Sequence, residues 1–295
     1  MTDPAPSSQT SSQVSSPSSR PRILIAAFEG WNDAGDAASG VIDHLVEVWA
    51  ASRVAELNSE DYYDYQVNRP SVDVGDSGVR TITWPSTYAA LATPDGFDHE
   101  VVLIRGIEPS MRWKAFSDEL VTLGKDMRVD LAITLGALLA DAPHTRPVPV
   151  TGNSADNALG ERLGYSPSRY RGPTGIVGVL QQAFTLAGIP AVSLWAAVPH
   201  YVAAPPCPKA TLALIGRIED VVEMSIPTGD LPEDARAWQR GVDELAAEDG
   251  EIAEYVRSLE EARDTSDLPE ASGEEIAREF ERYLRRRGTG GAEQN

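Results

Sequence analysis

The strongest constraint on the fold is the alternation of short apolar runs with amphipathic segments between residues 23 and 222. Residues 23–28 (ILIAAF), 131–135 (LAITL) and 191–198 (AVSLWAAV) are almost wholly apolar. Such runs are typical of strands buried on both faces of a sheet. Because amphipathic helices separate them, the sequence predicts βαβ units. It therefore favours a single α/β domain, with a mostly parallel or mixed sheet between helical layers.

The remaining elements follow from local periodicity and turn residues. Further strands are expected at residues 54–57, 79–84, 101–104 and 148–150, and 79–84 (VRTITW) alternates like a strand with one exposed face. Helical spacing predicts helices at residues 37–49, 111–127, 152–163, 174–187 and 210–222.

The character of the chain changes at Asp230. Apolar residues recur every three or four positions in an acidic helix from Trp238 to Leu259, with an interruption at residues 249–250, and a second helix is expected at 274–287. Two helices with one apolar stripe each predict a helical hairpin that packs on the α/β domain or on a neighbouring subunit. The expected organisation is a disordered tail (1–20), an α/β domain (21–228), a helical appendage (229–287) and a loose tail (288–295).

Charge and cysteine content restrict the classes of partner and compartment. A formal net charge of -20 argues against nucleic acid and anionic membranes, which are bound by clustered Lys and Arg. There is no apolar run long enough to span a bilayer, and the Ser/Pro-rich residues 1–19 lack the apolar region of a signal peptide. Cys207 is the one cysteine, so an intrachain disulfide is excluded and a reducing, cytoplasmic setting is expected. His200 is the nearest upstream histidine, which is a weak indication of a nucleophilic thiol.

Polar residues follow several of the predicted strands, where open α/β sheets place ligand or partner sites. They are Asn32, Asp33, Glu108, Asp141, His144, Arg146, Tyr170 and His200. Carboxylates and imidazoles could serve hydrolysis or phosphorolysis of a small molecule, and Glu108, Asp141 and His144 are the candidate catalytic residues. However, the sequence lacks the H-E-x-x-H and G-x-S-x-G motifs and any paired-cysteine metal site. No metal or cofactor is therefore expected.

Two segments have alternative interpretations. Residues 28–37 read as strand, glycine turn and helix start, an arrangement that can bind anions. The turn lacks G-x-G-x-x-G and a Walker lysine, and Asp33 and Asp36 would repel phosphate, so we interpret it as capped internally by Asn32 or Asp33. The tyrosine-rich residues 61–69 predict either a protein interface or a loop folded over the sheet.

Several motifs, in order along the chain, resemble the prokaryotic branch of the proteasome assembly chaperone family. They are WNDAG at 31–35, GIEP at 106–109 with Trp113, LGA at 135–137, DAPHTRP at 141–147, GPTG at 172–175 and the run from Leu194 through Pro199 to Val202. The resemblance covers about residues 22 to 260. It implies a three-layer α/β/α fold similar to nucleoside phosphorylases and hydrolases, homo-oligomers with a trimer as the first expectation, and contacts with proteasome subunits. Some family members carry a C-terminal hydrophobic-Tyr-X anchor, whereas this chain ends AEQN, so docking through the C-terminus is not expected.

Two functional hypotheses result. The first is a non-enzymatic, homo-oligomeric protein-binding or assembly factor, and the alternative is a small-molecule enzyme of the nucleoside phosphorylase or hydrolase type. The expected binding residues are Trp31, Asn32, Asp33, Arg146, Tyr170, Thr174, His200 and Tyr201. Polar groups that converge on a closed pocket would favour the enzyme, whereas a filled cleft would favour the binding protein.

Overall fold

A seven-stranded mixed sheet forms the centre of the protein. The computed structural model describes residues 20–75, 78–202 and 204–266. The strand order is β2-β5-β6-β1-β7-β9-β8, and the four central strands β6, β1, β7 and β9 are parallel to one another. The strands are β1 (Arg22–Glu29), β2 (Ser52–Glu56), β5 (Tyr88–Ala92), β6 (Glu100–Ile107), β7 (Val129–Ala140), β8 (Val150–Ser154) and β9 (Ala191–Pro199). Each of the pairs β2–β5, β5–β6 and β8–β9 is antiparallel.

Helices cover both faces of this sheet, because the buried strands alternate their apolar side chains between the faces. On one face, Ile23 and Ile25 of β1 belong to the core formed with α1 (Ala37–Val48) and α5 (Pro208–Val222). On the other face, Leu24 and Phe28 belong to the core formed with α2 (Trp113–Asp126) and α4 (Ile176–Leu186). The predicted three-layer α/β arrangement is thus confirmed.

Three short 3-10 helices connect these elements in the described residues. They are η1 (Ala34–Asp36), η2 (Ser59–Asp61) and η3 (His200–Val202).

One predicted helix begins later than expected. The helix predicted from Gly152 was wrong at its start, because Gly152 pairs with Leu194 of β9 and belongs to β8. Helix α3 (Asn157–Leu163) begins only after Asp156, whose carboxylate accepts a hydrogen bond from Leu159 N at 2.8 Å.

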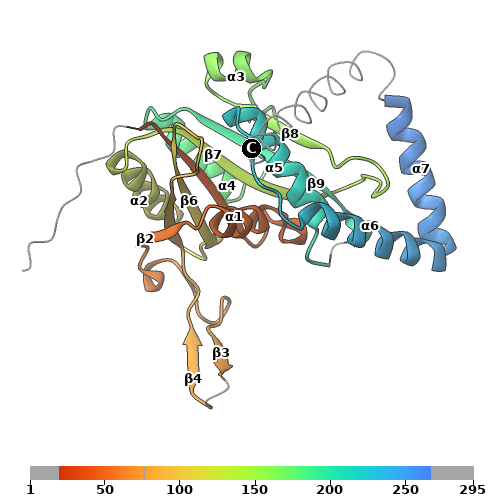
Figure 1. Cartoon of the computed structure of the whole chain (residues 1–295), viewed down its shortest axis with the longest axis horizontal. Helices are drawn as coiled ribbons and strands as arrows, with labels where there is room; N and C mark the ends of the chain where they lie inside the picture. The colour runs from red at the N-terminus through yellow and green to blue at the C-terminus, as the bar shows by residue number, and fades with distance from the viewer. Residues whose placement is uncertain (1–19, 76–77, 203, 267–295) are drawn as a thin grey trace, which may run out of the picture.

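One predicted strand lies outside the main sheet. Residues 79–84 do contain a strand, β4 (Arg80–Thr83), but its partner is β3 (Ser71–Val74) in a separate two-stranded ribbon. Figure 1 shows this ribbon projecting from the body of the protein. All eight residues of the two strands are exposed, so the expectation of a single exposed face was wrong.

The helical appendage packs on the α/β domain through α6 (Leu231–Glu248), which contacts α5. The apolar residues assigned to one acidic helix are in fact divided between α6 and α7 (Gly250–Ser266), which meet at a corner at Asp249 (Figure 1). The helix expected at residues 274–287 and the two tails lie outside the described residues, apart from Arg20. Within the described ranges, no helix is long and apolar enough to cross a membrane.

Candidate functional site

The turn after β1 is stabilised by its own side chains. The carboxylate of Asp33 accepts hydrogen bonds from the backbone N–H groups of Ala38 at 2.7 Å and Ser39 at 3.3 Å, at the start of α1. Asp33 is buried, and this burial raises the pKa of its carboxyl group above the usual value, although the hydrogen bonds act in the opposite direction. The turn is therefore capped internally by Asp33, which occupies the N–H groups that an anion would need.

Glu108 lies beside this turn, at the carboxyl ends of β1 and β6. Its Oε1 atom accepts hydrogen bonds from Asn32 Nδ2 at 2.7 Å and from Ile176 N at 2.9 Å. Because Ile176 is the first residue of α4, the start of this helix is occupied by a carboxylate of the protein itself. The packing is also close, since a Cβ atom on Gly175 would lie 2.2 Å from Asn32 Oδ1. Glu108 and Asn32 are therefore held against the start of α4 by close contacts.

His144 connects the loop after β7 to η3 and α6. The Tyr201 hydroxyl lies 2.8 Å from both the backbone N and Nδ1 of His144, and His144 Nε2 lies 3.0 Å from Asp243 Oδ1. If the hydroxyl donates its proton to Nδ1, Nε2 is the N–H group that donates to Asp243. Only 2% of His144 is exposed, so the imidazole is used as a buried structural link.

The other polar residues of this loop are engaged by α7. Asp141 accepts a hydrogen bond from the Tyr255 hydroxyl at 3.0 Å, and its carboxylate lies 3.3 Å from His200 Nδ1. Arg146 forms a bidentate pair with Asp264, at 2.9 and 2.7 Å, and a second ion pair with Glu260 at 3.1 Å. The side chain of Thr145 also bonds to Glu260.

The three candidate catalytic residues therefore do not converge. Glu108 bonds to residues at the start of α4, whereas Asp141 and His144 bond to the appendage. Asp141 and His144 were also considered as a cross-link within their loop, but their hydrogen bonds run to other elements. Among the described residues, no group of three or more His, Cys, Asp or Glu side chains is placed to hold a metal ion.

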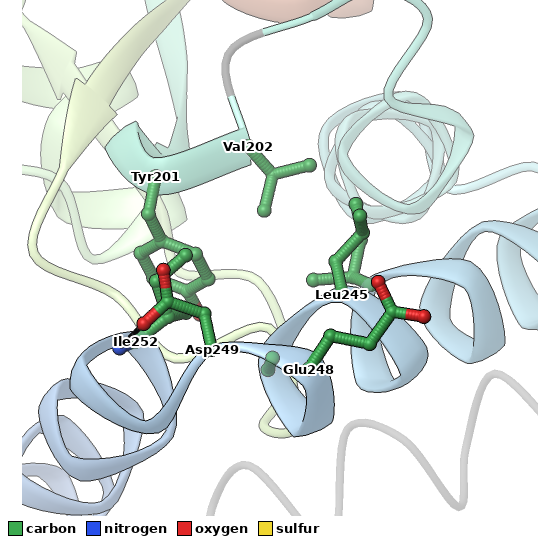
Figure 2. A pocket seen from close by; sticks show the side chains of 8 residues that line it. Tyr201, Val202, Leu245, Glu248, Asp249 and Ile252 are labelled. Carbon is green, nitrogen blue, oxygen red and sulfur yellow. Dashed lines mark hydrogen bonds between the residues drawn. The ribbon is translucent and has the colours of Figure 1, made fainter.

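An apolar hollow of about 340 Å³ opens beside this cluster, where η3 faces the corner between α6 and α7. Figure 2 shows Tyr201 and Val202 on one side of it and Leu245 on the other. The lining residues are Tyr201, Val202, Val242, Leu245, Ala246, Glu248, Asp249 and Ile252. The sequence indicated the apolar stripe of α6 and α7, but this stripe was assigned to the seam of a hairpin, so the hollow was missed.

Other expected binding residues lie on the surface. Trp31 is 69% exposed and Tyr170 is 67% exposed, and the Tyr170 hydroxyl donates a hydrogen bond to Pro173 O at 2.9 Å. Thr174 is also exposed, immediately before the start of α4. Aromatic side chains in such positions are available to a protein partner.

Two sequence features have structural roles instead. Cys207 is fully buried, which raises the pKa of its thiol, so a nucleophilic role for Cys207 is not supported. Tyr62 and Tyr63 are buried in the core formed with α2 and α4. The first part of the tyrosine-rich segment is therefore a loop folded over the sheet, as one of the two interpretations predicted.

The fold and these contacts define an α/β protein in which Glu108, Asp141 and His144 have internal hydrogen-bond partners, whereas Trp31 and Leu245 are exposed. The sequence model of the PAC2 family matches residues 27–246. The chain belongs to the PAC2 family, and the resemblance to prokaryotic proteasome assembly chaperones is confirmed at the level of the family.

Solved structures of relatives are similar over most of the chain. A PAC2 family protein from Streptomyces avermitilis MA is 56% identical with a TM-score of 0.75, over 80% of this chain and 99% of that one. A proteasome-assembly chaperone homologue from Mycobacterium tuberculosis is 52% identical with a TM-score of 0.73, over 79% of this chain and 99% of that one. An archaeal homologue of proteasome-assembly chaperone from Pyrococcus furiosus is 15% identical with a TM-score of 0.54, over 83% and 96%, and shares the fold. No curated protein matches the chain significantly.

Proposed function

We propose that the protein is a non-enzymatic, homo-oligomeric assembly factor of the cytoplasm that binds proteasome subunits or related proteins. One contrast carries this proposal: the polar strand-end residues are occupied by internal contacts, whereas apolar side chains such as Leu245 and Trp31 remain exposed. The relationship to proteins described as proteasome-assembly chaperone homologues supports the same class of function.

The hollow at the α6–α7 corner is the surface proposed to receive the partner. Leu245 is 58% exposed, and it lines the hollow together with Tyr201. We propose that one apolar side chain of the partner inserts between them. Glu248 and Asp249 lie at the same hollow, so the charge around it is negative. We therefore expect the partner to present an apolar side chain flanked by Lys or Arg.

A binding measurement with purified proteasome subunits tests this proposal. The variant Leu245→Glu places a charge in the hollow, and Leu186→Glu is a matched control, because Leu186 is 80% exposed at the far end of α4. We expect wild type and Leu186→Glu to bind a subunit equally, and Leu245→Glu to bind at least about tenfold more weakly. Equal binding by all three proteins would contradict the role of the hollow, and no binding to any subunit would contradict the proposed partner.

The alternative, a nucleoside phosphorylase or hydrolase, is not favoured. Each of its three candidate residues is hydrogen-bonded to a different partner. Glu108 bonds to Ile176, Asp141 to Tyr255 and His144 to Asp243. A catalytic site would require such groups within hydrogen-bond reach of one substrate. The separation of Glu108 from the other two is therefore the main argument against the enzyme.

A further inference from the structure

The hollow at the α6–α7 corner carries negative charge that no described basic side chain balances. Its apolar lining includes Tyr201 and Leu245, and Figure 2 shows Glu248 and Asp249 where α6 meets α7. Among the described residues, neither of these two carboxylates forms an ion pair. An occupant of the hollow should therefore bring positive charge beside an apolar side chain.

The surrounding appendage adds to this negative charge. Residues 231–266, which include α6 and α7, carry eleven carboxylates and four arginines. Glu251 and Glu254 are exposed in the first turns of α7. An acidic segment would be repelled from this corner, whereas a cationic segment is attracted to it.

An apolar strip leads from the hollow along α7. Ile252 lines the hollow, and Leu259 lies seven residues further on, on the same side of the helix. Both side chains are only half-buried. The strip runs toward Ser266, the last residue that the structure describes. A segment that continues beyond Ser266 can therefore return along this strip to the hollow.

The chain itself contains a segment with the required chemistry. Residues 282–287 read RYLRRR, so Tyr283 and Leu284 are flanked by four arginines, and this run contains no carboxylate. The run belongs to the helix expected at residues 274–287, which lies outside the described residues. It matches the partner expected for the hollow, an apolar side chain flanked by Lys or Arg.

The lengths of the two helices allow this segment to reach the hollow. Ile252 precedes Ser266 by fourteen residues, or about 21 Å along α7. The expected helix 274–287 also has fourteen residues, or about 21 Å. Residues 267–273 are long enough for a connection between antiparallel helices. A helix that returns along α7 therefore brings Leu284 to within about one helical turn of Ile252.

We propose that residues 282–287 bind the hollow of their own chain. Leu284 packs against its apolar lining, and the arginines that follow lie beside Glu248 and Asp249. Because only seven residues connect the expected helix to α7, the segment meets the hollow at an effective concentration on the order of millimolar. This connection favours the segment over a separate protein at micromolar concentration.

This contact would regulate the surface that receives the partner, so the inference rests on the proposed function. A subunit that inserts an apolar side chain into the hollow must first displace Leu284. The free protein is then a covered form, and its apparent affinity for the subunit is reduced by the fraction of molecules in which the hollow is open.

The first test is a disulfide between the segment and the hollow, and it requires no partner. In the full chain, Leu245→Cys combined with Leu284→Cys should form a disulfide within one chain upon mild oxidation, since cysteine is also apolar. The matched control combines Leu245→Cys with Ala277→Cys, seven residues or about 10 Å nearer the start of the expected helix, and should remain reduced. The natural Cys207 is fully buried and should not compete.

Electrophoresis without reductant distinguishes the outcomes. A disulfide within a single chain, formed by Leu284→Cys and not by Ala277→Cys, is the expected result. A disulfide between two chains would overturn the proposal, because the segment would then bind the hollow of another copy. Equal cross-linking of both pairs, or of neither, would also overturn it. None of these results depends on a proteasome subunit, so each would leave the proposed function standing.

The second test measures the release of the hollow. Leu284→Glu should expose it, and Ala277→Glu is the matched control with the same charge change. If the segment covers the hollow in about nine of ten molecules, Leu284→Glu should bind a subunit about tenfold more tightly than wild type, and Ala277→Glu should bind like wild type.

Unchanged binding by Leu284→Glu, in a protein that does bind a subunit, would overturn the inferred displacement. No binding by wild type or either variant would contradict the proposed function, and the disulfide then decides whether the segment binds the hollow.

Discussion

At the carboxyl ends of the strands, the carboxylates of Asp33 and Glu108 bond to backbone N–H groups at the starts of two helices. Asp33 and Glu108 were recognised in the sequence as candidate site residues, because they follow predicted strands. Capping of the helix start by Asp33 was one of the two predicted alternatives. The partner of Glu108 could not be predicted, since Glu108 bonds to α4, 68 residues further along the chain. A pattern of residue types locates a site, but it does not reveal whether the site is already filled.

Asp33 provides a prediction that depends on pH. Burial raises the pKa of Asp33 above 3.8, so the folded protein holds this proton at a higher pH than the unfolded chain does. At a pH above the pKa of Asp33 in the folded protein, the buried charge lowers the free energy of unfolding. This destabilisation disappears as the pH falls through that pKa, because the carboxyl group becomes neutral. Asp33→Asn removes the charge and keeps an oxygen acceptor. The free energy of unfolding of this variant minus that of wild type should therefore be highest near neutral pH and should decrease as the pH falls.

Urea denaturation at about pH 7 and about pH 4.5 measures this difference in the free energy of unfolding. Asp33→Ala is the control for the loss of the helix cap, and it should lower the free energy of unfolding by about 1 kcal/mol. A relative stability of Asp33→Asn that is unchanged or improves toward acid would contradict this account of the buried carboxylate.

His144 provides a second prediction at the same scale. Replacing His144 with Ala leaves the Tyr201 hydroxyl and Asp243 without this partner and opens space in a buried position. The free energy of unfolding should fall by about 1–3 kcal/mol. Leu186→Ala on the exposed end of α4 should change it by less than about 0.5 kcal/mol. An equally small effect at His144 would mean that the buried link contributes little to the fold.

Helices and strands were predictable where the apolar residues of a segment follow a single periodicity. The apolar runs of β1, β7 and β9 and the helical spacing of α1, α2, α4 and α5 predicted type and order, because each buries a continuous face. β4 was recognised as a strand but not as part of a ribbon, since its pairing with β3 depends on partners that local periodicity does not encode. The α6–α7 corner was visible as an interruption at Asp249, but the angle between the helices was not.

The attachment of α7 gives a prediction about salt. Its polar contacts to the loop after β7 are the Arg146 pairs with Glu260 and Asp264, the Asp141–Tyr255 hydrogen bond and the Thr145–Glu260 hydrogen bond. The Arg146 pair with Asp264 is exposed and the pair with Glu260 is partly buried, so added salt should screen the first pair more than the second. Raising NaCl to about 0.5 M should increase amide hydrogen exchange in α7 more than in α6, which packs on α5.

The variant Arg146→Gln is the matched control for this experiment. It removes both ion pairs at once, so exchange in its α7 should be faster at low salt and should respond little to added NaCl. Equal exchange in α6 and α7 at every salt concentration would show that the Arg146 ion pairs do not hold α7 in place.

At the scale of the whole molecule, residues 20–75, 78–202 and 204–266 expose an apolar hollow and a two-stranded ribbon. The proposed binding of other proteins depends on such exposed features, among them the apolar hollow at the α6–α7 corner and the β3–β4 ribbon. The family was predictable from short motifs along the chain, because those motifs include the turn, strand-end and loop residues that the fold uses internally. The interacting surfaces were harder to predict, since they combine residues from distant parts of the chain.

The most direct test of this account is a time course of proteasome assembly. Purified α-type and β-type subunits are mixed with or without the protein, and native mass spectrometry follows the intermediates. The account predicts that wild type accelerates formation of an early intermediate and is found bound to it, whereas Leu245→Glu does neither. Assembly at the same rate with and without the protein, and no bound intermediate, would contradict the proposed function.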